Sequence, residues 1–217
     1  MIYKIIIILL IICVPMVALS ADSKPSKSDL PPLMDVRHKK PVDNSKEIKR
    51  IEDYLNNIKT FKASFTQNTS DGQYATGTFY LSRPGRLRWQ YDPPAHILIV
   101  AKGRILKYYD TEMNEATYVN ISDTLAGLLV RKEISFSKDI EIKKIDITDE
   151  VIAMKLEQTG KADQGNLILI FNNKEPLTLE EMVVTDSSGT QSLIKFGKPE
   201  YNVSMNDDLF SLPNGKF

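Results

Sequence analysis

The sequence predicts a mainly β protein of the α+β class, in which a curved antiparallel sheet is covered by two helices. From residue 61 onward, apolar and polar residues alternate with a period of two in many short segments, which indicates strands with one buried face. These segments follow one another closely, without the crossover helices that parallel strands need. A meander of this length curls into a barrel or half-barrel, whose mouth or concave face can receive the apolar sides of two helices.

The first helix is predicted over residues 46–60. Its apolar residues recur at the spacing of one helical face, whereas charged residues such as Lys49 and Glu52 fall on the other side. Ser45 is the candidate N-cap, because a serine hydroxyl can accept a hydrogen bond from the first turn. The apolar face consists of Ile48, Ile51, Tyr54, Leu55 and Ile58.

The strands are predicted from the period-two segments and from the turn residues between them. The expected strands are 61–67, 77–82, 87–91, 96–100, 105–109, 116–121, 140–147, 151–158, 166–171, 179–185 and 191–196, with a closing strand over 209–215. Turns are expected at Asp71-Gly72, Pro84-Gly85, Lys102-Gly103 and Ser188-Gly189.

The second helix is predicted over residues 122–130, where the alternation stops. Leu125, Leu128 and Leu129 fall at helical spacing, and Ser122 or Asp123 is the candidate N-cap. A short helix with so apolar a face needs a concave partner to cover it.

Arg83 is the least expected residue of the hairpin over 77–92. It follows Phe79 and Leu81 at a spacing of two, so its side chain should point to the same apolar side of the sheet at the end of the strand. Pro84 also favours an extended conformation at Arg83. A cation at the edge of an apolar face needs hydrogen-bond partners there.

The first 45 residues are predicted to lie outside the folded domain, which then spans residues 46–217. Residues 1–20 have the form of a secretory signal peptide, with Lys4 before an apolar stretch; an uncleaved membrane anchor is the alternative. Residues 21–45 are polar and rich in proline, which is typical of a disordered arm.

The composition excludes some functions, and no catalytic or metal-binding motif is evident. Acidic and basic residues are equal in number, at 28 each, which argues against a strongly basic nucleic-acid binder. His38 and His96 are isolated, and the only cysteine, Cys13, falls in the predicted signal peptide, so we expect neither a metal nor a cofactor. Trp89 could stack on a sugar or base, although a core position is the commoner role. Scattered carboxylates leave a hydrolase as a remote alternative.

Several short motifs occur in a fixed order between residues 46 and 217. They are Phe61-x-Ala63-x-Phe65-x-Gln67, Gly77-x-Phe79-x-Leu81-x-Arg83-Pro84, Leu87-Arg88-Trp89-x-Tyr91-x-x-Pro94, Ile99-Val100-Ala101-x-Gly103, Tyr109-Asp110 and Phe210-x-Leu212-Pro213. As an ordered set they resemble the LolA family, the periplasmic carriers of outer-membrane lipoproteins. Residues 122–165 match only in pattern.

The resemblance implies an unclosed, strongly curved antiparallel β-barrel with the two helices as a lid over an apolar cavity. It implies that Arg83 donates hydrogen bonds to backbone carbonyls of the lid and so holds the empty carrier closed. Leu55 matches a leucine that lines the lid. Leu87 replaces a large apolar residue, often phenylalanine, that helps to receive acyl chains.

The residues expected to line the cavity and its lid share an apolar side chain on the predicted inner face. They are Ile48, Ile51, Leu55, Ile58, Phe79, Leu81, Leu87, Trp89, Tyr91, Ile97, Ile99, Ile152, Met154 and Leu156. From the residues alone, each of them could equally belong to an ordinary hydrophobic core.

The function that the resemblance implies is that of a monomeric, non-enzymatic carrier in the periplasm. It would take up acylated lipoproteins from an inner-membrane lipoprotein-releasing ABC transporter of the LolCDE type and deliver them to the outer membrane. Whether an outer-membrane acceptor of the LolB type receives them stays open. The alternative is a LolA-like binding module that senses lipid or stress in the cell envelope.

Overall fold

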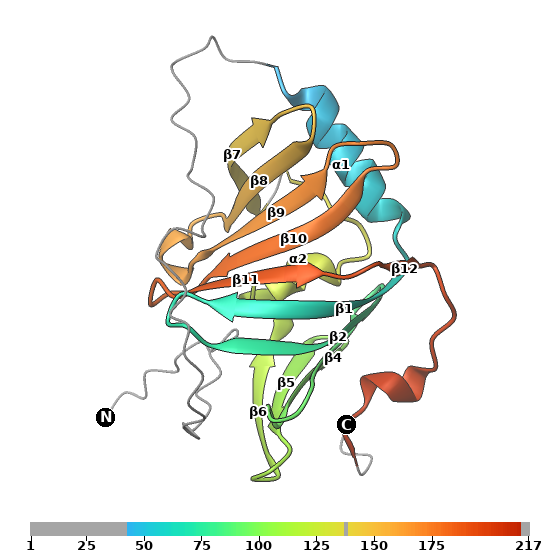
Figure 1. Cartoon of the computed structure of the whole chain (residues 1–217), viewed down its shortest axis with the longest axis vertical. Helices are drawn as coiled ribbons and strands as arrows, with labels where there is room; N and C mark the ends of the chain where they lie inside the picture. The colour runs from blue at the N-terminus through green and yellow to red at the C-terminus, as the bar shows by residue number, and fades with distance from the viewer. Residues whose placement is uncertain (1–42, 137–138, 214–217) are drawn as a thin grey trace, which may run out of the picture.

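The computed structural model describes residues 43–136 and 139–213, in which twelve strands form one sheet (Figure 1). The predicted signal peptide and nearly all of the predicted arm lie outside the described residues. The strands are β1 (Thr60–Thr69), β2 (Tyr74–Ser82), β3 (Arg86–Tyr91), β4 (Ile97–Lys102), β5 (Ile105–Asp110), β6 (Glu115–Asn120), β7 (Ile140–Ile147), β8 (Val151–Gln158), β9 (Asn166–Asn172), β10 (Thr178–Thr185), β11 (Gln191–Phe196) and β12 (Glu200–Tyr201). Every predicted strand except the closing one is therefore present.

The sheet consists of two antiparallel meanders joined side by side. Strands β1 to β6 pair consecutively, strands β7 to β11 pair consecutively, and β1 pairs with β11. The short β12 also pairs with β1. The two end strands, β6 and β7, are not neighbours in the sheet order, so the barrel is not closed. The predicted unclosed, curved antiparallel architecture is confirmed.

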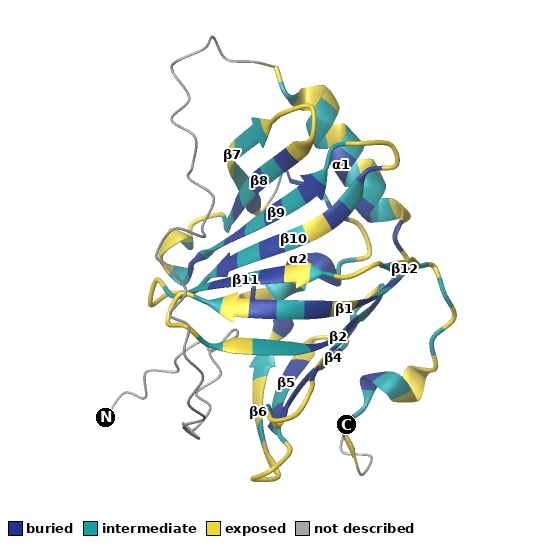
Figure 2. Cartoon of the chain, in the orientation of Figure 1, coloured by how far each residue is buried: buried dark blue, intermediate teal, exposed yellow. Residues whose placement is uncertain are grey.

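Burial along β1 and β8 follows the predicted period of two, whereas β4 is buried at five consecutive residues (Figure 2). In β1 the side chains of Phe61, Ala63 and Phe65 are buried, and those between them are half-buried or exposed. In β8 the buried residues are Ile152 and Met154, followed by Leu156. These buried side chains of β1 and β8 all belong to one cluster on the face that we call the concave face.

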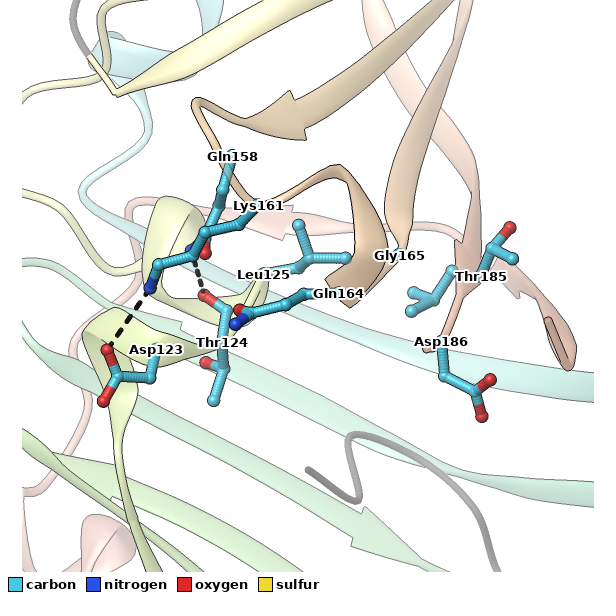
Figure 3. A pocket seen from close by; sticks show the side chains of 10 residues that line it. Asp123, Thr124, Leu125, Gln158, Lys161, Gln164, Gly165, Thr185 and Asp186 are labelled. Carbon is cyan, nitrogen blue, oxygen red and sulfur yellow. Dashed lines mark hydrogen bonds and ion pairs between the residues drawn. The ribbon is translucent and has the colours of Figure 1, made fainter. Parts of the chain in front are cut away.

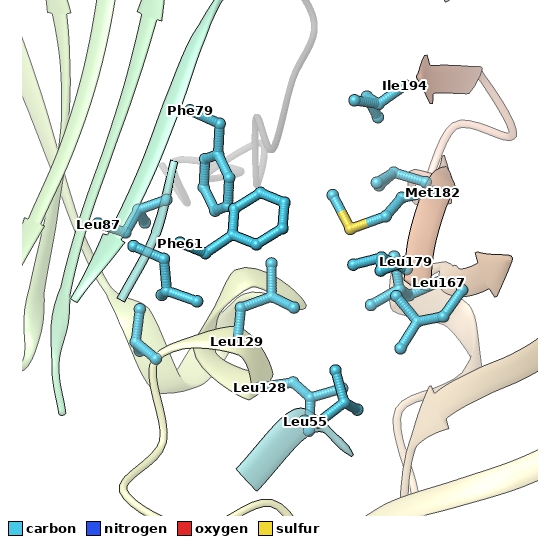
Figure 4. Close-up of a cluster of buried hydrophobic side chains, with 14 of the residues drawn as sticks. Leu55, Phe61, Phe79, Leu87, Leu128, Leu129, Leu167, Leu179, Met182 and Ile194 are labelled. Atoms are coloured by element: carbon cyan, nitrogen blue, oxygen red, sulfur yellow. The ribbon is translucent and has the colours of Figure 1, made fainter. Parts of the chain in front are cut away.

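Two helices and a 3-10 turn cover the concave face, and we call them together the helical lid. They are α1 (Ser45–Asn57), η1 (Ile121–Asp123) and α2 (Ala126–Leu129). Figure 4 shows Leu55 of α1 and Leu128 and Leu129 of α2 between the two halves of the sheet, with Phe79 on one side and Met182 on the other. The lid thus fills the space that the curved sheet encloses.

Both ends of α1 differ from the prediction. Ser45 lies in the first turn, and the N-cap is Asn44, which makes no side-chain cap bond. The Asp43 carboxylate instead accepts a hydrogen bond from the Ser45 N–H at 3.0 Å. At the other end Ile58 is extended, because Thr60 already pairs with β2. Strand pairing therefore ends the helix before residue 60.

The central helical segment is not one continuous helix over the predicted range of 122–130, and its cap is a different residue. Asn120, rather than Ser122 or Asp123, provides the cap, since its carboxamide oxygen accepts a hydrogen bond from the Ser122 N–H at 3.2 Å. The N-cap of α2 is Leu125, which makes no side-chain cap bond. The segment therefore folds as the 3-10 turn η1 followed by the single helical turn α2.

The prediction of a closing strand over 209–215 is wrong. Asp207–Phe210 forms a 3-10 helix, η3, because the Asn206 side chain accepts a hydrogen bond from the Asp208 N–H at 3.0 Å and starts a turn. Residues 214–217 lie outside the described residues. The strand that follows β11 and pairs with β1 is β12 instead.

The C-terminal segment covers a second, smaller apolar cluster on the opposite, convex face of the sheet. Phe210 and Leu212 pack there with Leu98, Val100 and Tyr109 of β4 and β5. This part of the sheet is therefore covered on both faces, by the helical lid inside and by the C-terminal segment outside.

Gly77 in β2 provides a test of this close packing. A Cβ at this position would meet the carbonyl oxygen of Gln90 and come within 2.7 Å of the Phe65 ring. We expect Gly77→Ala to lower the free energy of unfolding by about 2–3 kcal/mol, the upper part of the usual range of about 1–3 kcal/mol for overpacking. Urea denaturation followed by circular dichroism measures the change. Thr78→Ala, on the other face of the strand, is the control and should cost less than about 1 kcal/mol; equal midpoints for the two variants would contradict the prediction.

Candidate functional site

Arg83, directly after β2, holds the C-terminal ends of both helices. Its Nε donates a hydrogen bond to the carbonyl oxygen of Leu129 in α2 at 2.6 Å. Its Nη1 donates to the carbonyl oxygen of Leu55 in α1 and to that of Ile58 at 3.1 Å. Carbonyls in the last turn of a helix lack N–H partners within the helix, so they are available to an external donor. One side chain therefore joins the sheet to both helices of the lid.

The guanidinium of Arg83 keeps its charge although it is largely withdrawn from water. Burial lowers the pKa of Arg83 to about 10, while Tyr54 acts in the opposite direction. A pKa of about 10 still leaves the group protonated at neutral pH. The positive charge lies at the C-terminus of α1, where the helix dipole is negative and stabilises a cation.

Tyr54 fixes the middle of α1 to the other half of the sheet. Its hydroxyl accepts a hydrogen bond from the Leu179 N–H at 2.9 Å and lies 3.0 Å from the hydroxyl of Tyr201. The Leu179 N–H is free for this bond because the register between β9 and β10 shifts between Leu179 and Glu181. Burial raises the pKa of Tyr54 and of Tyr201, so both stay neutral and hydrogen-bonded.

The two parts of the helical lid are also joined to each other. The Asn56 carboxamide of α1 donates to the Ile134 carbonyl oxygen at 2.9 Å and accepts from the Ile134 N–H at 2.7 Å. The Glu52 carboxylate accepts a hydrogen bond from the Phe136 N–H at 2.8 Å. Helix α1 and the loop after α2 are therefore held together by side chains of the helix that bond to backbone groups of the loop.

The start of the η1–α2 segment is held by the second meander (Figure 3). The Gln158 Nε2 donates to the carbonyl oxygens of Ser122 and Thr124, both at 3.3 Å. The Lys161 ammonium forms an ion pair with Asp123 at 3.6 Å. The segment is thus fixed at one end by β8 and its following turn, and at the other end by Arg83.

A cavity of about 280 Å³ lies between the turn after β2 and the η1–α2 segment. Pro84, Gly85, Ile121 and Val130 form part of its lining. The Gly85 N–H donates to the Val130 carbonyl oxygen at 2.8 Å, which is a further link between this turn and the end of α2. The structure therefore leaves space beside the contact that Arg83 makes with the lid.

The apolar residues predicted for the cavity and lid all come together on the concave face. Ile48 packs half-buried against the cluster, and the others are buried members of it. From the helix these are Ile51, Leu55 and Ile58; from the first meander Phe79, Leu81, Leu87, Trp89, Tyr91, Ile97 and Ile99; from the second meander Ile152, Met154 and Leu156. They pack against the lid as a core would, so their role as a cavity wall stays a prediction.

Much of the second half of the concave face was missed by sequence reasoning. Its buried residues include Leu167, Leu169, Phe171, Met182 and Ile194. The period of two showed that these residues belong to strands, but it gave no sign that β11 pairs with β1. That pairing makes one continuous surface of the two meanders.

Other site types find no support in the part of the chain that the structure describes. Over residues 43–136 and 139–213, no helix has the length and apolar character needed to cross a bilayer. Within the same ranges, no three His, Cys, Asp or Glu side chains gather as a metal site would require.

Comparison with known proteins gives the family. The model of the family described as "Outer membrane lipoprotein carrier protein LolA" matches residues 56–213. The chain belongs to the LolA family. An outer-membrane lipoprotein carrier protein of Nitrosomonas europaea is 27% identical over 171 residues, which cover 75% of this chain and 82% of the relative. Another, from Coxiella burnetii, is 27% identical over 170 residues, which cover 74% and 80%.

The LolA match includes Arg83, α2 and every strand, whereas it begins at Asn56, near the end of α1. A solved structure of a LolA superfamily protein from Nitrosomonas europaea aligns with a TM-score of 0.47 at 13% identity, covering 76% of this chain and 97% of that chain. The family assignment therefore depends on the sequence match. The family is described as a carrier and not as an enzyme.

Removal of the Arg83 side chain should loosen the lid of this LolA-family protein. We expect Arg83→Leu to raise the rate of amide hydrogen exchange in α2 and in the last turn of α1 at least tenfold, because a hydrogen bond from a charged donor is worth about 1.5–3 kcal/mol. Hydrogen exchange followed by mass spectrometry measures this change.

Arg88→Leu is the matched control for that experiment. The Arg88 Nη1 also donates to two backbone carbonyls, those of Leu209 at 3.0 Å and Ser211 at 3.3 Å, but on the convex face. We expect this variant to expose the C-terminal segment and to leave exchange in the helical lid unchanged. Equal rates of amide hydrogen exchange in the lid of both variants would mean that the hydrogen bonds of Arg83 do not stabilise the closed lid.

Proposed function

We propose that this protein is a periplasmic carrier that binds the acyl chains of lipoproteins released from the inner membrane and delivers them to the outer membrane. The observation that carries the proposal is the position of Arg83 between an apolar concave face and the C-terminal carbonyls of the two helices that cover it. The family description and the names of the relatives, which are lipoprotein carriers, support the same function.

The physical problem for such a carrier is to hold acyl chains in water and still release them. An acyl chain with about 15 methylene groups gains roughly 12 kcal/mol on leaving water, at about 0.8 kcal/mol for each group. A permanently open apolar cavity would retain two or three such chains almost irreversibly. Some of this free energy must therefore be consumed by a change in the protein.

Opening the helical lid would supply that change. Arg83 stabilises the closed, empty state by about 1.5–3 kcal/mol through bonds that are lost when the helices move away. The apolar side chains of the lid must also leave the concave face before acyl chains can occupy it. The net affinity is then the acyl transfer free energy reduced by the cost of opening.

The remaining parts of the route are proposed on the family description. The predicted signal peptide directs the chain to the periplasm, and an inner-membrane lipoprotein-releasing ABC transporter of the LolCDE type supplies the cargo. The carrier acts as a monomer without a cofactor or chemical reaction. An outer-membrane acceptor of the LolB type is a candidate for the final step.

The central claim is tested by complex formation. The purified protein is mixed with a triacylated lipoprotein in detergent, the detergent is removed, and the product is analysed by size-exclusion chromatography with light scattering. We expect a soluble complex of one carrier and one lipoprotein. If the lipoprotein precipitates whether or not the protein is present, the carrier function is refuted.

Release is tested with the same pair of arginine variants. We expect Arg83→Leu to accept lipoprotein but to pass it to outer-membrane vesicles at least tenfold more slowly, because its closed state no longer competes with the cargo. The measurement is the fraction of labelled lipoprotein that sediments with the vesicles over time. Arg88→Leu should transfer as the unmodified protein does; normal transfer by Arg83→Leu would refute the proposal that Arg83 stabilises the closed lid against the cargo.

A further inference from the structure

Trp89 carries a buried indole N–H that has no hydrogen-bond acceptor among the described residues. Its side chain is only 4% exposed. The nearest rings are hydrocarbon, with the centroids of Phe79 and Phe65 at 4.6 Å and 5.1 Å from that of the indole. A buried donor without an acceptor destabilises a protein, and a phenylalanine at this position would avoid that cost.

The position of Trp89 places this donor in the middle of the concave face. In the ladder between strands, Trp89 pairs with Phe79 of β2 and with Ile99 of β4. The next inward-facing residue toward Arg83 is Leu87, and the next in the other direction is Tyr91. Trp89 therefore belongs to the surface that acyl chains would occupy once the lid has moved.

Two buried polar side chains of the same cluster and its ladder, Tyr91 and Gln67, are satisfied without a guest, whereas the Arg86 Nε and the Gln164 Oε1 also lack a partner among the described residues. The Tyr91 hydroxyl donates a hydrogen bond to the Gln67 Oε1 at 2.8 Å, and both side chains are buried. Burial raises the pKa of Tyr91, so the hydroxyl keeps the proton that it donates. The missing acceptor at Trp89 is therefore a feature of that residue and not of the whole face.

We propose that Trp89 binds the carbonyl group of the cargo's acyl chain. The proposal rests on the carrier function above and names the chemical group that the same site recognises. An acyl chain has one good hydrogen-bond acceptor, the carbonyl oxygen of its ester or amide link, because its methylene groups have none. When the chain replaces the lid on the concave face, the indole N–H gains the partner that the closed protein does not supply.

This contact gives the site two properties that apolar walls lack. It favours chains attached through esters or amides over chains attached through ethers, since an ether oxygen is a poorer acceptor and lies at a different place relative to the chain. It also sets how far the head of one acyl chain enters the interior, because the carbonyl must come within about 3 Å of the indole nitrogen.

Nuclear magnetic resonance tests the contact directly, because Trp89 is the only tryptophan in the sequence. The ¹⁵N-labelled protein gives one indole N–H signal. Three peptide probes are used. The first has an amino-terminal S-diacylglyceryl cysteine, so both of its acyl chains are attached through esters. The second is its dialkyl-ether analogue, and the third is the N-palmitoylated form of that analogue, in which one acyl chain is attached through an amide. We expect a downfield shift of the indole proton with the ester or the amide probe and not with the plain ether.

Affinity measurements give the second readout. We expect the ester probe to bind about three- to tenfold more tightly than the ether probe, the range for one neutral hydrogen bond. Trp89→Phe keeps an aromatic ring and removes the donor, so this preference should disappear. Phe79→Leu, which alters the neighbouring ring without removing a polar atom, should weaken both probes and keep their ratio.

The outcomes separate this inference from the carrier function. If no probe binds the unmodified protein, the carrier function itself fails. If all probes bind with equal affinity and the indole signal moves equally with each, the carrier function stands and Trp89 is only part of the apolar wall. If the amide probe alone shows the effect, the recognised carbonyl is that of the N-acyl chain and not of the diacylglyceryl group.

Discussion

The structure depends on the hydrogen bonds between one arginine and the C-terminal ends of two helices. Arg83 is placed at the rim of the concave face by the parity of β2, and its planar guanidinium directs Nε toward α2 and Nη1 toward α1. A lysine ammonium, a compact charge without a rigid fork, cannot hold two separate groups in this way. Because the acceptors are backbone carbonyls, the contact does not depend on the side chains of the lid. It depends instead on both helices ending at the same point.

The two apolar faces of the sheet are covered to different extents, by the helical lid over the larger cluster and by the C-terminal segment over the smaller one. On the concave face, the lid is held by apolar packing, by hydrogen bonds to backbone groups, and by ion pairs of Asp123 with Lys161 and of Arg50 with Glu175. On the convex face, the C-terminal segment also has ion pairs from Arg86 and Lys102 to Asp207, and these two cations lower the pKa of that carboxyl. We infer that the helical lid, rather than the C-terminal segment, moves away from the sheet, because acyl chains can replace its apolar packing.

The sequence predicted the strands well because each strand of a curved sheet must alternate between a wet and a buried side, and the position of Arg83 followed from the same parity. The residues alone could not identify the partners of Arg83, since the carbonyls of Leu55 and Leu129 have no signature in the side chains; only the resemblance to the LolA family implied carbonyls of the lid as acceptors. Sequence reasoning also missed the pairing of β1 with β11, which joins residues far apart in the chain. The error at residues 209–215 has a local cause: Asn206 and Asp208 favour a capped turn over continued pairing.

Arg83 and Trp89 are polar groups at an apolar interior, and they are satisfied in opposite states. In the closed protein, Arg83 has its carbonyl acceptors and the Trp89 indole has none. In the loaded protein that we propose, Arg83 loses those acceptors and the indole gains one from the cargo. A lipid without a carbonyl must open the lid at the same cost in free energy, but it forms no such hydrogen bond with the indole. The free energy of opening therefore sets the binding free energy that a lipid must exceed, and the contact with the carbonyl favours the lipids that carry this group.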